Sequence, residues 1–115
     1  MATMTDAFVE DVTRATAARV ADRCSNPSCR RLTSGPHNDR RKSLTLGLAV
    51  RIATASPGGR RYDPLLADHE HGAPGNAIWL CQNCANVVDH DVVLYSASVL
   101  RAWKRAAEES AGEMR

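Results

Sequence analysis

The chain has 115 residues and a formal net charge of +2, which predicts one domain (residues 1–115), because half that length is too short for a core of its own. Alanine supplies 18 of its apolar residues and only five residues are aromatic, so we expect a thin core that needs a further stabilising element such as a metal. No apolar run approaches the length of about 18 residues of a membrane span, and we find no secretory signal at the N-terminus. We therefore expect a cytoplasmic protein without membrane contact.

Charge is divided into two blocks along the chain. Residues 30–61 carry eight Lys or Arg and one acidic residue, whereas residues 62–95 carry five acidic residues and no Lys or Arg. A basic block beside an acidic one is typical of a polyanion-binding surface next to a cation site. Two solvated loops that pair with each other would give the same pattern.

The first predicted element is an amphipathic helix over residues 5–21. Its stripe, at intervals of three and four residues, consists of Val9, Val12, Thr16 and Val20. Residues 30–43 are polar and rich in Arg, Ser, Gly and Pro, which predicts a loop. His37 lies in this loop and is expected to face solvent.

The four cysteines form two close pairs, and 51 residues separate Cys29 from Cys81. Two tight turns, the first favoured by Asn26-Pro27, would bring four thiolates to one point, as a tetrahedral metal requires. We therefore predict zinc bound by Cys24, Cys29, Cys81 and Cys84. Four sulfur ligands leave no open coordination position, so the zinc would be structural. The alternatives are two disulfides in a secreted chain, or four unrelated thiols.

Two strands are predicted between the cysteine pairs. Residues 44–55 form the first, with an apolar side made of Leu46, Leu48, Val50 and Ile52. Residues 56–59 break it, and the chain is expected to stay irregular as far as Gly75. Residues 77–80 form a short second strand, and a helical turn or two follows from Cys84 to about Asp89.

The last predicted element is a helix over residues 96–112, for which Ser96 is a suitable N-cap. Its apolar stripe consists of Val99, Leu100, Trp103, Ala106 and Ala107. We expect this stripe to pack in the core. Residues 22–95, between the two terminal helices, would then form the zinc-bearing part of the domain.

This series of segments resembles the four-cysteine zinc branch of the HNH endonuclease superfamily. The segments that carry the resemblance are CSNPSC (24–29), GLAVRIATASPGGRRYD (47–63), NAIWLCQNC (76–84), Val88-Asp89, and LRAWK (100–104) with Glu108. The resemblance implies an α+β fold, a small zinc-stapled ββα-metal (HNH-like) domain with flanking N- and C-terminal helices. It also implies a setting in restriction, mobile elements or phage defence.

Two positions depart from the pattern of the active members. The resemblance implies that active members use two histidines. One, in the first strand, takes a proton from the attacking water. The other, after the second cysteine pair, holds the catalytic metal. This chain has Arg51 and Ala85 there, although it retains the middle asparagine as Asn76. Arginine stays charged and cannot act as a base, and alanine has no lone pair for a metal. Arg51 suits holding a phosphate.

The leading hypothesis is accordingly a catalytically degenerate HNH-like zinc module that binds nucleic acid, DNA in particular, or a protein partner. A nuclease-derived scaffold would keep a basic groove whose phosphate contacts are independent of sequence. The contacts that we expect are Arg40, Arg41, Lys42, Arg51, Arg60 and Arg61.

Two other functions fit the sequence. One is an active endonuclease dependent on Mg²⁺ or Mn²⁺, in which relocated ligands replace the missing histidines. The candidates for that role are His69, His71 and His90, all of which lie beside carboxylates. The other is a small interaction subunit that docks onto a larger protein through its helices, Tyr95 and Trp103.

Overall fold

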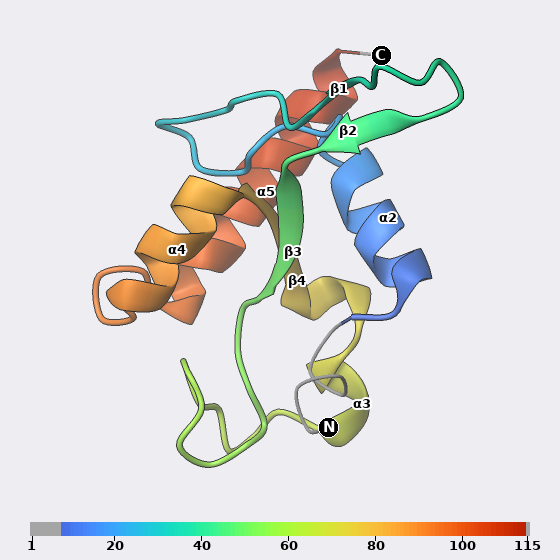
Figure 1. The fold of residues 1–115 in the computed structure, drawn as a ribbon. Helices are drawn as coiled ribbons and strands as arrows, with labels where there is room; N and C mark the ends of the chain where they lie inside the picture. The colour runs from blue at the N-terminus through green and yellow to red at the C-terminus, as the bar shows by residue number, and fades with distance from the viewer. Residues whose placement is uncertain (1–7, 115) are drawn as a thin grey trace.

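Two antiparallel strands at the centre of the molecule organise the fold, which the computed structural model describes for residues 8–114. β3 (Gly47–Arg51) pairs with β4 (Ala77–Cys81), and a separate hairpin consists of β1 (Ser34–Pro36) and β2 (Ser43–Thr45). The helices are α2 (Glu10–Ala18), α3 (Asp68–His71), α4 (Gln82–His90) and α5 (Ala97–Glu113), with a 3-10 helix, η1, at Pro74–Asn76. The chain is therefore a small α+β domain with two hairpin-like sheets (Figure 1).

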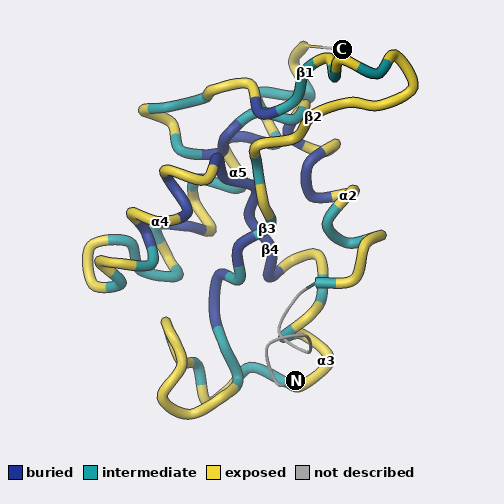
Figure 2. Tube along the Cα trace, viewed as in Figure 1, coloured by how far each residue is buried: buried dark blue, intermediate teal, exposed yellow. Residues whose placement is uncertain are grey.

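Helices cover both faces of the β3–β4 pair. Figure 1 shows α2 on one side of the strands and α4 on the other, and every residue of β4 is buried (Figure 2). Successive strand side chains point to opposite faces. Ile78 therefore packs in one cluster with Val88 of α4 and Leu100 of α5. Trp79 packs in a second cluster with Val20, which follows α2.

The N-terminal helix, α2, is shorter than the predicted span of residues 5–21. Of the predicted span, residues 5–7 lie outside the described residues, and α2 begins at Glu10. The helix ends before Ala21 and Asp22, whose φ angles of 56° and 59° are left-handed. The predicted stripe is buried at Thr16 and Val20, whereas Val9 is 66% exposed.

The predicted strand over residues 44–55 is wrong in its extent, and so is the predicted loop over residues 30–43. The chain changes sheet at Leu46, whose N–H donates to the Thr33 carbonyl and whose carbonyl accepts from Gln82. Val50 and Ile52 of the predicted apolar side are buried. Leu46 is 60% exposed, because the change of sheet carries it away from the β3–β4 core. Leu48, also on that side, is 39% exposed.

The segment before β4 is more regular than predicted, because it contains α3 and η1. The Glu70 side chain caps α3 by accepting from the Ala67 N–H at 2.9 Å. Further on, α4 begins two residues before the predicted start. The predicted N-cap of α5 is confirmed, since Ser96 Oγ accepts from the Val99 N–H at 3.3 Å.

The final stripe is buried at Leu100 and Ala107, while Ala106 is exposed. No helix among the described residues is both long and apolar enough to cross a membrane.

Candidate functional site

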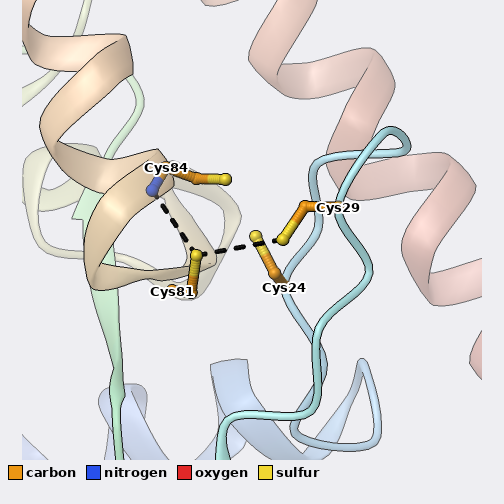
Figure 3. A group of neighbouring side chains, drawn as sticks. All are labelled: Cys24, Cys29, Cys81 and Cys84. Carbon is orange, nitrogen blue, oxygen red and sulfur yellow. Dashed lines mark hydrogen bonds between the residues drawn. The ribbon is translucent and has the colours of Figure 1, made fainter.

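The four cysteines come together at the N-terminus of α4 (Figure 3). All four are free thiols, and their sulfur atoms lie within 4.8 Å of one another. The Sγ atoms of Cys29 and Cys81 are 3.9 Å apart. A zinc ion with four thiolates at about 2.3 Å separates its sulfurs by about 3.8 Å. The four-sulfur set and its spacing therefore fit a structural zinc ion, and the alternative of two disulfides does not apply.

Asn26 shapes the first cysteine turn and reaches the second pair. Its carbonyl accepts from the Cys29 N–H at 2.9 Å, and its side-chain oxygen accepts from the Ser28 N–H at 2.9 Å. Its amide nitrogen donates to Cys84 Sγ at 3.5 Å. The Cys84 N–H donates in turn to Cys81 Sγ at 3.4 Å. The turn that the Asn-Pro step predicts is confirmed, and both turns supply N–H donors to sulfur.

The protonation of the thiols depends on burial. Burial raises the pKa of the Cys24 thiol and that of the Cys84 thiol above the ordinary value of 9.0. Burial also opposes ionisation of Cys81, but hydrogen bonds, led by that from the Cys84 backbone, leave the pKa of Cys81 below its ordinary value. Since zinc binds thiolates, it must displace the protons of the buried thiols.

A second group of predicted residues lines a hollow of about 280 Å³ at the far end of β3. We call it the basic hollow. It is lined by Val50, Arg51, Thr54, Ser56, Gly59, Arg60, Arg61, His71 and Asp89. Arg51, Arg60 and Arg61 outnumber the single carboxylate of Asp89, so the hollow is positively charged.

Arg51 and Ala85 do not meet in this hollow. The Arg51 guanidinium lies over the Phe8 ring, 4.4 Å from its centre, and its Nε donates to the His71 carbonyl at 2.9 Å. Ala85 is buried in the core and does not line the hollow. The residue of α4 that does so is Asp89, one helical turn further on.

Asn76 holds the backbone around the hollow. Its side-chain amide donates to the carbonyls of Ala53 and His71 at 2.8 and 2.9 Å and accepts from the Ala53 N–H at 3.0 Å. Asn76 is 6% exposed. It thereby ties the segment after β3 to the end of α3, whose carbonyl also accepts from Arg51.

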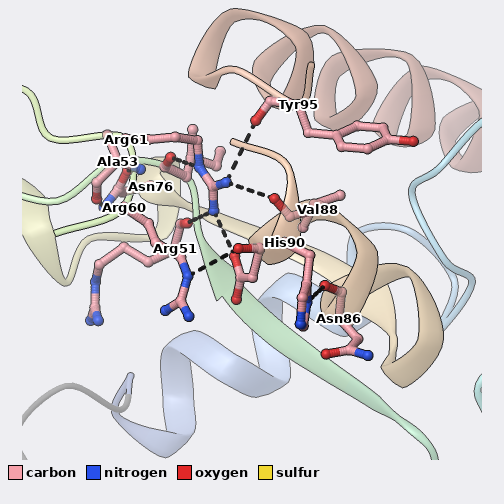
Figure 4. Close-up of polar contacts among 11 residues, drawn as sticks. Arg51, Ala53, Arg60, Arg61, Asn76, Asn86, Val88, His90 and Tyr95 are labelled. Atoms are coloured by element: carbon pink, nitrogen blue, oxygen red, sulfur yellow. Dashed lines mark hydrogen bonds and ion pairs between the residues drawn. The ribbon is translucent and has the colours of Figure 1, made fainter. Parts of the chain in front are cut away.

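Arg61 is a buried member of the basic hollow, and Figure 4 shows its guanidinium among the backbone carbonyls that it contacts. Its side chain is 3% exposed and pairs with the Asp89 carboxylate at 3.0 Å. It also donates to backbone carbonyls at 2.7–3.5 Å, those of Arg51, Ile52, Val88 and Tyr95. Its φ of 51° is left-handed, a conformation that surrounding contacts must hold. The structure thus assigns Arg61 a structural role in place of the expected phosphate contact, because its N–H groups bind this chain.

The remaining basic residues fall in two places. Arg60 is exposed beside the basic hollow, where its Nε donates to the Asp89 carbonyl at 3.2 Å. Arg40, Arg41 and Lys42 are exposed in the turn between β1 and β2. Figure 1 shows this turn at the opposite end of β3 from the loop that follows the strand. The expected single groove is therefore divided into two basic groups, the hairpin tip and the basic hollow.

The histidines proposed as relocated ligands do not converge. Among residues 8–114, the four cysteines are the single group of three or more side chains placed to hold a metal. His71 Nδ1 accepts from the Ala55 N–H at 3.1 Å, which leaves the proton of the neutral ring on Nε2. His69 is exposed, as is His90, whose Nδ1 lies 2.7 Å from the Asn86 carbonyl.

His37 and Tyr95 differ from expectation, whereas Trp103 packs against the core, as predicted for the stripe of the last helix. His37 is half-buried and accepts from the Asp39 N–H at 2.9 Å, so it does not simply face solvent. Tyr95 and Trp103 form an edge-to-face pair with ring centres 5.5 Å apart, and both pack against the core. Both rings therefore contribute to the core. Asn26 was not predicted to be a hydrogen-bond donor to sulfur, and its position between two cysteines was the one sign of that role in the sequence.

The chain matches no protein-family model, and no curated protein matches its sequence.

Proposed function

We propose that this protein is a zinc-stabilised, HNH-like module that binds nucleic acid and does not cleave it. The observation that carries the proposal is the basic hollow, a positively charged recess at the C-terminal end of β3. The order β3, loop, β4, α4, with the cysteine cluster at the start of α4, is consistent with a ββα-metal unit. We take the basic hollow as the place where the proposed module would hold a phosphodiester.

Loss of cleavage follows from the residues in the hollow. Arg51 stays protonated and cannot take a proton from water. His71 uses its Nδ1 lone pair on the Ala55 N–H, so the neutral ring offers an N–H donor and not a base. Asp89 is the one carboxylate among the lining residues, and it is paired with Arg61. This set suits retention of an anion better than activation of water by a metal.

The binding energy is expected to come from phosphate contacts at two places. Arg60 and Arg51 line the basic hollow, while the hairpin tip adds three exposed cations, Arg40, Arg41 and Lys42. Each phosphate contact with duplex DNA releases counterions, and the slope of log K against log salt changes by about 0.9 for each one. The affinity should therefore be independent of sequence and strongly dependent on salt.

Fluorescence anisotropy with labelled duplex DNA, titrated at several salt concentrations, tests this proposal. We expect binding at low salt that Arg60→Ala weakens, with a smaller salt slope. Arg105→Ala, which removes an exposed arginine of α5 that belongs to neither basic group, is the matched control and should bind like the wild type. Undetectable binding at low salt by the folded, zinc-loaded protein would contradict the proposal.

A plasmid-nicking assay on the same preparation tests the absence of cleavage. We expect intact plasmid with Mg²⁺ and with Mn²⁺. Nicking that alanine at His69, His71 or His90 abolishes would instead establish an active endonuclease with relocated ligands.

A further inference from the structure

A second hollow of about 340 Å³ adjoins the basic hollow, and Arg61 lines both. We call it the tyrosine hollow. It is lined by Arg61, Tyr62, Asp63, Val92, Ser96, Ala97 and Arg101. Tyr62 is 43% exposed, and the Arg101 side chain stands at the start of α5, also exposed. An accessible aromatic ring with apolar and charged neighbours therefore lies next to the recess proposed for a phosphate.

We propose that the tyrosine hollow takes an unpaired nucleobase, stacked on Tyr62, while the phosphate of the same strand lies in the basic hollow. The chain then binds single-stranded nucleic acid more tightly than duplex. This inference rests on the proposed function. Stacking on an aromatic side chain tolerates any base, because every base has a π-face, so it adds affinity without sequence readout.

The backbone around Arg61 supports this arrangement. Arg60 lines the basic hollow and Tyr62 lines the tyrosine hollow, and the buried Arg61 between them is held by backbone carbonyls on β3, α4 and the α4–α5 connection. Arg60 and Tyr62 therefore flank an anchored residue and line neighbouring hollows. In a nucleotide the sugar likewise lies between the phosphate and the base, so each of the two neighbouring hollows would receive one of these groups.

Each hollow is lined by one carboxylate, but three arginines line the basic hollow and two line the tyrosine hollow, so the basic hollow is the more positively charged of the two. Asp63 lines the tyrosine hollow, and one of its carboxylate oxygens accepts from the Leu65 N–H at 2.9 Å. A carboxylate repels phosphate but accepts hydrogen bonds from the amino groups of bases. The arginines of the basic hollow attract phosphate. Arg101, an exposed residue that lines the tyrosine hollow, offers a further cation to the same strand.

Duplex DNA cannot use the tyrosine hollow without losing a base pair. A paired base is stacked on both sides, and extruding it costs a few kcal/mol. Duplex binding therefore depends on the phosphate contacts alone, whereas a single strand gains the stacking contact as well.

The test compares a labelled single-stranded oligonucleotide with a duplex of the same sequence, by anisotropy, using the full zinc-loaded chain. We expect tighter binding of the single strand, and Tyr62→Ala should weaken that binding about 5- to 150-fold while leaving duplex binding unchanged. Tyr62→Phe keeps the ring and should retain single-strand affinity. Leu65→Ala, which truncates a 90% exposed side chain on the same loop outside both hollows, is the matched control.

Crosslinking of an iodouracil-substituted single strand gives a measurement that needs no variant, and the labelled residue is expected to be Tyr62. Equal affinity for single-stranded and duplex nucleic acid, with no effect of Tyr62→Ala, would overturn the base-stacking inference. The proposed function would still stand if Arg60→Ala weakened the binding of both forms. Absence of binding to either form would overturn both.

Discussion

The indole ring of Trp79 lies against the α-carbon of Gly47, so that a Cβ atom built on Gly47 would sit 2.5 Å from two ring carbons. The ring cannot easily move, because Trp79 is 4% exposed and its Nε1 donates to Thr33 Oγ1 at 2.9 Å. We therefore predict that Gly47→Ala lowers the free energy of unfolding by about 1–3 kcal/mol. Gly35→Ala, where a Cβ meets nothing within 4 Å, is the control. Urea unfolding in the presence of zinc measures both, and equal losses would contradict the overlap.

Asn76 is expected to matter for stability as well as for the shape of the basic hollow. Asn76→Ala leaves the N–H and carbonyl of Ala53 without their side-chain partner in a buried place. We predict a loss of about 2–3 kcal/mol of unfolding free energy. Asn83→Ala removes an exposed amide of α4 and should change stability little. A variant at Asn76 as stable as the wild type would show that these hydrogen bonds do not hold the loop.

The cysteine cluster should control folding. Structural zinc contributes on the order of 10 kcal/mol to small domains, which exceeds the stability that so thin a core can supply. We predict that Cys81→Ser leaves a largely unfolded chain without zinc, as circular dichroism and metal analysis would show. Ser28→Ala, at an exposed position of the first cysteine turn, should keep both fold and metal. An unchanged melting curve for Cys81→Ser would refute the assignment.

Zinc affinity should fall as the pH falls. Burial raises the pKa of Cys24 and of Cys84, so these thiols are protonated at neutral pH in the metal-free chain and zinc must displace their protons. Calorimetric titration in buffers of different ionisation enthalpy would measure the proton release. We expect net release near neutral pH and weaker binding as the pH is lowered. Binding without proton release would mean that the thiols are not the ligands.

Glu108 joins the two terminal helices and should contribute a pH-dependent share of stability. Hydrogen bonds from Arg19, at 2.8 and 3.1 Å, and an ion pair with Lys104 at 3.2 Å hold the pKa of Glu108 below 4.5, against the opposing effect of burial. A lowered carboxyl pKa stabilises the fold fully above the ordinary value and loses that effect as the pH falls through the folded-state value.

We accordingly predict that Glu108→Gln costs about 0.5–1 kcal/mol, because the pair is partly exposed. The cost should be constant between neutral pH and about pH 5.5. Glu109→Gln, on the exposed side of the same helix, is the control. Thermal unfolding of the three proteins across this range measures the difference, and a cost that grows with falling pH would contradict the sign.

Local signals in the sequence were sufficient for the metal cluster and for several elements. The spacing of the cysteines predicts two converging turns, and Ser96 before an apolar stripe predicts the start of α5, which its capping hydrogen bond confirms. These features depend on residues near one another in the chain. Spacing alone therefore reveals them.

Features that depend on distant backbone atoms were not predictable in this way. The sequence predicts that Arg61 is an exposed phosphate contact, yet its side chain is buried against carbonyls from β3, α4 and Tyr95. The sequence predicts that Leu46 belongs to one continuous strand. Its backbone hydrogen bonds to Thr33 and Gln82 instead hold it where the chain passes from one sheet to the other. Alternating hydrophobicity carries no information on either contact, because the partners are main-chain groups that every residue has.

The most direct test of the account is X-ray absorption at the zinc edge of the purified, folded protein. The account predicts one zinc per chain with a single shell of four sulfur atoms at about 2.3 Å. A shell with nitrogen or oxygen ligands, or fewer than four sulfurs, would contradict the convergence of Cys24, Cys29, Cys81 and Cys84 on one ion.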